Sequence, residues 1–174
     1  MFGLNKKSSF IENKLYNKIV NLSRNKFFYE KLYFSDTFQN RINLIFIHIS
    51  FIFINFKKEN NTDSYNEFFQ KMFDLTFKKI EQNMREIGYS DTMVNKNMKF
   101  LVKVFYNILL NCEKYKNKSI DQKKFFLKKY IITTNRNKPY NNDLLLKYFD
   151  KYQSFCLDLH LDNVLKGELN FNYK

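Results

Sequence analysis

The sequence predicts an all-α protein, a single-domain bundle of about six helices around a long central apolar helix. The length of 174 residues fits one domain with one shared core. Apolar residues in several segments recur every three or four positions, which is the spacing of an amphipathic helix, and cap residues precede these segments. We expect one domain over residues 1–174, with flexible ends at residues 1–8 and 168–174.

The first predicted helix covers residues 9–23. Ser9 and Glu12 have the spacing of a capping box, in which each side chain binds a free backbone amide at a helix start. Four aliphatic residues then fall on one helical face: Ile11, Leu15, Ile19 and Leu22. A short apolar piece at residues 27–32 follows and leads to the next helix start.

The central helix is predicted from Ser35 or Asp36, which can cap it, to about Lys58. It contains the most apolar run of the chain, INLIFIHISFIFINF at residues 42–56. Isoleucines alternate in part of this run, as in a strand, but a stretch of about twenty residues without a turn signal is too long for an ordinary strand. As a helix the run spans about 22 Å, short of the roughly 30 Å hydrocarbon core of a bilayer. A buried helix is therefore favoured over a transmembrane span.

Two helices are predicted after a loop at residues 59–64. Ser64 and Glu67 form a second capping box, and apolar residues keep helical spacing from there to residue 87. Gly88 is placed to end this helix in the left-handed conformation. Ser90 or Asp91 can then cap a helix that extends to about residue 115.

The last two helices are predicted over residues 121–133 and 142–161. Pro139 lies in the turn between them, and Gly167 precedes a polar tail. No internal repeat or second domain is indicated.

The chain is strongly basic, with 30 Lys and Arg against 17 Asp and Glu, a net charge of +13 and a pI near 9.6. Such an excess attracts phosphate-rich partners such as anionic lipid head groups or ribosomal RNA. It is also expected of a solvated surface in a lysine-biased proteome, since Lys, Asn, Ile, Phe and Tyr dominate the composition as an AT-rich genome would dictate. Both interpretations stay open.

The cysteines and the N-terminus exclude several classes of protein. Cys112 and Cys156 lie in segments predicted as separate helices, which argues against a disulfide framework or a zinc cluster and favours a reducing compartment. Cys112 continues an apolar stripe, as an inert buried thiol does. The first residues show neither the apolar run of a signal peptide nor the composition of a transit peptide.

No arrangement of reactive side chains is indicated. His48 stands among isoleucines and phenylalanines and is expected to be a hydrogen-bonded core residue. Asp158, His160 and Asp162 would share one side only of an extended segment, whereas on a helix they diverge. Neither an activated nucleophile nor a Gly-rich phosphate loop is present. We therefore predict no catalytic residue, cofactor, metal ion or small-molecule substrate, and no enzyme activity.

Two stretches resemble the ubiquinol-cytochrome c chaperone family. Residues 27–56, FFYEKLYFSDTFQNRINLIFIHISFIFINF, are similar to a family pattern of an aromatic pair, a Leu, Asp-Thr, an Arg and an apolar helix with a His. Residues 69–115 contain FFQKMFD, MREIGYSDTMV, Lys96 and FYNILLNCEKY, which is the more specific match. Asn40 and Asn95 stand where the family usually has Gly, and we expect Asn there to tolerate a left-handed backbone.

The resemblance implies an all-helical, non-catalytic assembly factor without a cofactor. Its implied partners are newly synthesised cytochrome b and assembly intermediates of the bc1 complex, the ubiquinol-cytochrome c reductase or respiratory complex III. The implied location is the bacterial cytoplasm, with peripheral association at the inner membrane, where an anionic membrane surface or the ribosome is a possible contact. The alternative from the residues alone is a basic helical module that binds RNA, the ribosome or an anionic membrane surface as its main task.

Ten basic residues are candidates for a client or partner surface. Arg41 and Arg85 lie in the matched stretches, where ion pairs to a carboxylate, such as that of Glu81 four residues before Arg85, are the structural alternative. The remaining candidates are Lys96 and the densest basic stretch of the chain: Lys114, Lys116, Lys118, Lys123, Lys124, Lys128 and Lys129.

Overall fold

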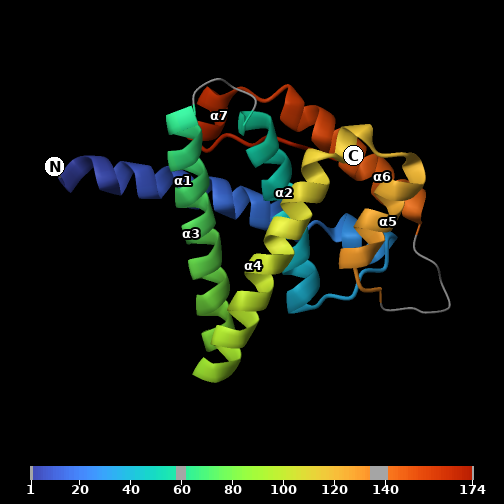
Figure 1. The fold of residues 1–174 in the computed structure, drawn as a ribbon, viewed down its shortest axis with the longest axis horizontal. Helices are drawn as coiled ribbons and strands as arrows, with labels where there is room; N and C mark the ends of the chain where they lie inside the picture. The colour runs from blue at the N-terminus through green and yellow to red at the C-terminus, as the bar shows by residue number, and fades with distance from the viewer. Residues whose placement is uncertain (1, 58–61, 134–140, 174) are drawn as a thin grey trace.

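The computed structural model describes residues 2–57, 62–133 and 141–173. These residues form seven α helices, a short π helix and a 3-10 turn, and they contain no strand, only one isolated bridge between Phe34 and Thr133. The all-α class is therefore confirmed, with one helix more than the roughly six expected. Figure 1 shows α2 near the middle of the molecule, with the other helices arranged around it.

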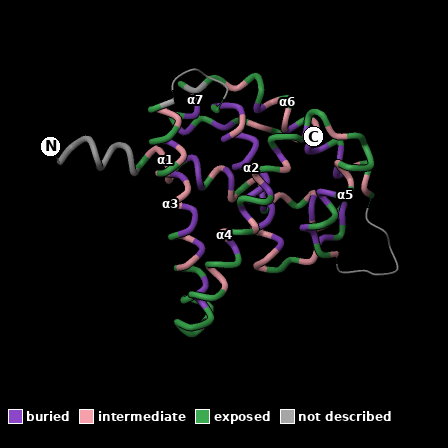
Figure 2. The backbone as a smooth tube through the Cα atoms, viewed as in Figure 1, coloured by how far each residue is buried: buried purple, intermediate pink, exposed green. Residues whose placement is uncertain are grey.

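The predicted central apolar helix is α2, Phe38–Lys57. Fifteen of its residues are buried, and α1, α3, α4 and α6 all pack against it. Figure 2 shows this buried helix in the interior of the bundle. The alternating isoleucines thus lie in a helix that is buried nearly all round, where β-branched side chains gain packing contacts that outweigh their weak preference for strands.

The N-terminal helix is longer than predicted. It forms α1, Phe2–Ser23, so the capping-box pattern at Ser9 does not mark its start. The expected apolar face is present, since Leu15 and Ile19 are fully buried. A π helix, Phe27–Lys31, then occupies the predicted short apolar piece and buries Phe28. The side chains of residues 1–9 lie outside the described part of the chain, and the flexibility of both chain ends stays a prediction.

The hairpin of α3, Thr62–Glu86, and α4, Asp91–Glu113, follows the sequence closely. Gly88 has φ +91, its amide donates to the Arg85 carbonyl, and the Tyr89 amide donates to the Met84 carbonyl. This is the hydrogen-bond pattern of a Schellman motif, which only a left-handed residue permits. Ser90 caps α4 as predicted.

The predicted start of α3 is less accurate. Ser64 and Glu67 lie inside the helix, because α3 already begins at Thr62. Residues 58–61 of the predicted loop lie outside the described residues. A 3-10 turn, Tyr115–Asn117, follows α4 and buries Tyr115.

The next helix, α5, covers Ile120–Tyr130 and begins with a capping box between Ser119 and Gln122. It ends three residues before the predicted limit of Thr133 because Ile131 adopts an extended conformation. The following residue, Ile132, bonds to Asn40 of α2 instead of continuing the helix. The predicted turn at Pro139 lies outside the described residues.

The predicted helix over residues 142–161 is two helices, α6, Asn142–Leu157, and α7, Leu161–Leu165. The expectation of one continuous helix was wrong at residues 158–160, where His160 has extended backbone angles. The Leu159 carbonyl accepts a hydrogen bond from the Asn55 side chain at 3.0 Å, which holds this break against α2. Sequence spacing alone does not reveal such a contact between distant segments.

Candidate functional site

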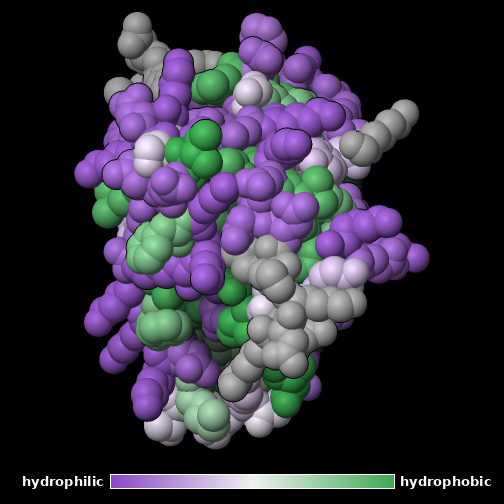
Figure 3. Space-filling model, turned by 90° about the vertical axis from the view of Figure 1, so that its right-hand side faces the viewer, coloured by the Kyte–Doolittle hydropathy of each residue, from purple (hydrophilic) through white to green (hydrophobic). Residues whose placement is uncertain are grey.

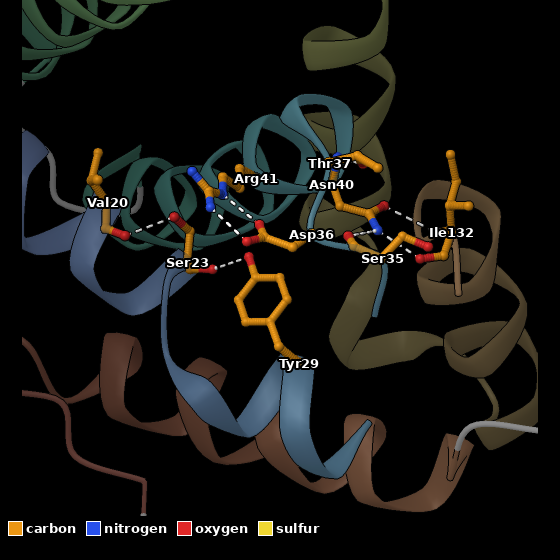
Figure 4. A network of polar contacts seen from close by, with 9 residues as sticks. All are labelled: Val20, Ser23, Tyr29, Ser35, Asp36, Thr37, Asn40, Arg41 and Ile132. Atoms are coloured by element: carbon orange, nitrogen blue, oxygen red, sulfur yellow. Dashed lines mark hydrogen bonds and ion pairs between the residues drawn. The ribbon is translucent and has the colours of Figure 1, made fainter. Parts of the chain in front are cut away.

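A polar junction joins the end of α1, the π helix and the start of α2 (Figure 4). Arg41 makes a two-pronged ion pair with Asp36, with Nε and Nη2 each 2.7 Å from a carboxylate oxygen. This hydrogen-bonded pair holds the pKa of the Asp36 carboxyl below its ordinary value. Beside it, the Tyr29 hydroxyl donates to the Ser23 carbonyl at 2.8 Å. The ion-pair alternative for Arg41 is thus present, although its side chain stays 42% exposed.

Asn40 is the centre of the same junction. Its side-chain amide donates to the carbonyls of Ser35 and Ile132 at 2.7 and 2.6 Å, and its side-chain oxygen accepts from the Ile132 amide at 2.9 Å. Asn40 lies within α2, Asn95 lies within α4, and neither is among the described residues with positive φ. Neither position therefore requires the left-handed backbone that Asn was expected to tolerate. At Asn40 the side chain acts through its hydrogen bonds.

A groove of about 230 Å³ opens next to this junction, between α1, α2 and α3. Its apolar lining is made mainly of Val20, Phe38, Ile42, Ile45 and Ile80, and Ile87 stands at its edge with 57% of its surface exposed. Tyr16 and several polar residues complete the lining: Ser23, Arg24, Arg41, Asn83 and Glu86. An apolar cavity flanked by arginines suits an apolar chain segment that carries a few polar or acidic groups. Of the residues that line this groove, Arg41 alone was a candidate from the sequence.

Arg85 lies near the C-terminal end of α3 and binds two carboxylates. It bonds Glu81 at 2.8 Å, the predicted neighbour four residues earlier, and it also contacts Asp91 at the start of α4. The second contact was not predicted. The ion-pair alternative is thus present at Arg85 as well, and it links the two helices of the hairpin.

The lysine-rich segment 114–129 divides into two groups. Lys123 bonds Asp150 at 2.9 Å and lies 4.7 Å from the Tyr115 ring, and Lys124 bonds Asp143 at 2.5 Å. These two lysines therefore attach α5 to α6. Within the described chain the other five, Lys114, Lys116, Lys118, Lys128 and Lys129, have no ion pair. Figure 3, viewed from the α5 side, shows a largely hydrophilic face with hydrophobic side chains between the polar ones.

The ten candidate cations are not gathered in one cleft. Arg41 lies on α2, Arg85 on α3 and Lys96 on α4, while the lysine-rich segment runs from the end of α4 through α5. The role of these residues in binding a client or partner stays a prediction.

His48 lies in the core, as expected, and is fully buried. A carbonyl only accepts, so His48 Nδ1 carries the proton and donates to the Leu44 carbonyl at 2.6 Å, which leaves Nε2 to accept from the Tyr148 hydroxyl at 2.8 Å. Burial lowers the pKa of His48 to about 4. The ring is therefore neutral at physiological pH and holds α6 against α2.

The remaining reactive groups are separated or buried. Cys112 and Cys156 are both fully buried free thiols, and burial raises the pKa of each. Asp158, His160 and Asp162 are all exposed around the break between α6 and α7. In the described ranges, no three His, Cys, Asp or Glu residues are grouped as metal ligands would be. Over the same ranges, each helix is either too short or too polar to span a bilayer.

Comparison with known proteins places the chain. The family model described as ubiquinol-cytochrome C chaperone matches residues 30–169, which is most of the sequence. The chain belongs to this family. Its match covers Asp36, Asn40 and Arg41 of the polar junction, the groove helices α2 and α3, and the lysine-rich segment, so these features lie within the ubiquinol-cytochrome c chaperone domain. No curated protein matches the sequence.

The fold is also similar to a solved structure. The crystal structure of the Cbp3 homolog from Brucella abortus superimposes with a TM-score of 0.81 and 22% sequence identity, over 97% of this chain and 92% of that chain. The two proteins therefore share the same all-helical fold over nearly their whole lengths.

Proposed function

We propose that the chain is a non-catalytic chaperone that holds newly synthesised cytochrome b during assembly of the bc1 complex. The observation that carries this proposal is the ubiquinol-cytochrome c chaperone match over residues 30–169. Cytochrome b is an apolar membrane protein, so a chain that holds it before assembly must offer apolar surface. We further propose that the chaperone works in a bacterial cytoplasm, peripherally at the inner membrane.

The groove between α1, α2 and α3 is the proposed contact for the client. Its lining offers aliphatic and aromatic side chains, and Arg24 and Arg41 stand beside them. Apolar client side chains would replace water against this lining, which releases about 25 cal/mol for each Å² of apolar surface buried. The arginines would pair with polar or acidic groups of the same client segment.

Deletion of the gene tests the proposal. The bc1 complex should be lost and cytochrome b protein depleted while the cytochrome b transcript remains, because an unassembled client is degraded. Affinity purification of the tagged chain from gently solubilised membranes should recover cytochrome b. A normal cytochrome b level in the deletion strain would reject the proposal.

A single substitution tests the groove. Ile87→Lys places a charge at the groove edge, at a residue already 57% exposed, so folding should be preserved while recovery of cytochrome b drops at least about tenfold. Leu157→Lys on α6 adds the same charge at an exposed leucine outside the groove and should leave recovery unchanged. If both variants recover the same amount of cytochrome b, the groove is not the client contact.

A second candidate function is binding of RNA or the ribosome as the main task. It is favoured by the five lysines of residues 114–129 that lack an ion pair among the described residues. Filter binding over a salt series distinguishes this function, because affinity for phosphates falls steeply as salt rises. Weak binding whose affinity does not change with salt concentration would exclude RNA or ribosome binding as the main task.

A further inference from the structure

The outward face of α4 combines positive charge with exposed apolar side chains. In Figure 1 the α4 ribbon passes in front of α2. One side of the helix is buried through Val94, Leu101, Phe105, Ile108 and Cys112. The opposite side carries exposed residues at helical spacing, which we call the cationic face of α4: Met93, Lys96, Lys99, Phe100, Lys103, Leu110 and Lys114.

Among the described residues, no acidic neighbour neutralises the charge of this face. Lys96, Lys99, Lys103 and Lys114 have no ion pair with any described residue. The acidic residues of α4 lie at its two ends, and both are already paired. Asp91 contacts Arg85, and Glu113 bonds Lys57 at 2.8 Å. Four positive charges therefore face outward along the helix.

The apolar side chains between these lysines are at least half exposed. Met93, Phe100 and Leu110 are 50%, 56% and 54% exposed, and they lie on the same side as the lysines. Burial of these side chains against a partner surface would be favourable in free energy, because it removes apolar surface from water. Lysine is suited to such a site, since its aliphatic stem can lie along apolar material while the ammonium group reaches a phosphate.

We infer that the cationic face of α4 docks on the surface of an anionic phospholipid bilayer. Head-group phosphates would pair with the lysines, and the acyl boundary just below would receive Met93, Phe100 and Leu110. A bare polyphosphate chain such as RNA offers charge but no comparable layer for a methionine and a leucine. The helix is about 34 Å long and would lie flat, since its other side remains packed on α2.

A tryptophan reporter tests this docking directly. The sequence contains no Trp, so Phe100→Trp introduces a single fluorophore on the face. Its emission should shift to shorter wavelength with vesicles of phosphatidylcholine and phosphatidylglycerol, and not with phosphatidylcholine alone. Leu157→Trp, on α6, is the matched control and should not shift. An unshifted Phe100→Trp spectrum, or an equal shift in the control, would overturn the inference.

Charge variants measure the contribution of the lysines. Lys96→Gln, Lys99→Gln and Lys103→Gln combined should weaken sedimentation with anionic vesicles at least about tenfold, since each lysine near such a surface contributes substantially. The control triple Lys31→Gln, Lys151→Gln and Lys166→Gln removes the same charge from exposed positions on other elements. Equal weakening by both triples would overturn the inference, and so would tight RNA binding that needs the α4 lysines without vesicle binding. Neither measurement uses cytochrome b, so its result is independent of the proposed client.

Discussion

The polar residues of α2 and the lysines of α4 show two opposite uses of polarity on neighbouring helices. In α2, Asn40, Asn43 and His48 are buried and hydrogen-bonded to other parts of the chain. On α4, Lys96, Lys99 and Lys103 are exposed and have no ion pair within the described ranges. Polar side chains on α2 therefore stabilise the fold, whereas those on α4 remain accessible to a partner.

The difference lies in what surrounds each group. A buried polar group must find a partner, because leaving it unpaired costs about 1–3 kcal/mol. An exposed lysine is satisfied by water and loses little when its neighbours change. These three polar residues of α2 should therefore be sensitive to substitution for stability, and the three exposed lysines of α4 insensitive. Matched pairs of variants from the two regions test this contrast.

The largest effect is expected at Asn40. Asn40→Leu removes three hydrogen bonds, each worth roughly 1 kcal/mol, and leaves the Ile132 amide without its partner, so the free energy of unfolding should fall by about 3 kcal/mol. The Ile132 and Ser35 carbonyls still accept from the Ser35 and Thr37 amides. Asn95→Leu, at an exposed position of α4, should change the free energy of unfolding by less than about 0.5 kcal/mol. Urea denaturation followed by circular dichroism measures both. Similar values for the two variants would remove the contrast.

A smaller effect is expected from the protonation of His48. Its pKa is about 4 in the folded state, against about 6.5 for an unperturbed histidine. Between these values the unfolded chain binds the proton and the folded chain does not, so stability falls as the pH is lowered. From pH 6.5 to pH 5 the loss should be about 1.5 kcal/mol.

Denaturation at several pH values measures this slope, and the second histidine provides its control. His160 is exposed, so His160→Gln should retain the slope. His48→Gln should reduce it, because the buried titrating group is gone. A wild-type stability that is flat over this range would show that His48 keeps a near-normal pKa.

The contrast between α2 and α4 also marks the limit of what the sequence could predict. Helical spacing and caps depend on residues within a few positions, and they correctly located α2, the turn at Gly88 and the start of α6. The breaks at residues 131 and 158–160 depend on Asn40 and Asn55, which are distant in sequence, so local patterns missed them. For the candidate site, charge density identified the lysine-rich segment. Which lysines have partners depends on Asp143 and Asp150 of α6, and only the fold brings these together.

The smallest effect is expected at Lys123, a lysine that is largely buried and has a partner. Its side chain is only 17% exposed and combines an ion pair to Asp150 with the contact to the Tyr115 ring. Lys123→Gln should lower the free energy of unfolding by about 1 kcal/mol. Lys103→Gln on α4 removes the same charge without breaking a described ion pair and should leave stability unchanged or slightly higher, because the net charge of +13 repels itself. Thermal or urea denaturation of the two variants side by side measures the difference, and a larger loss at Lys103 would show that the face of α4 is structural and not available to a partner.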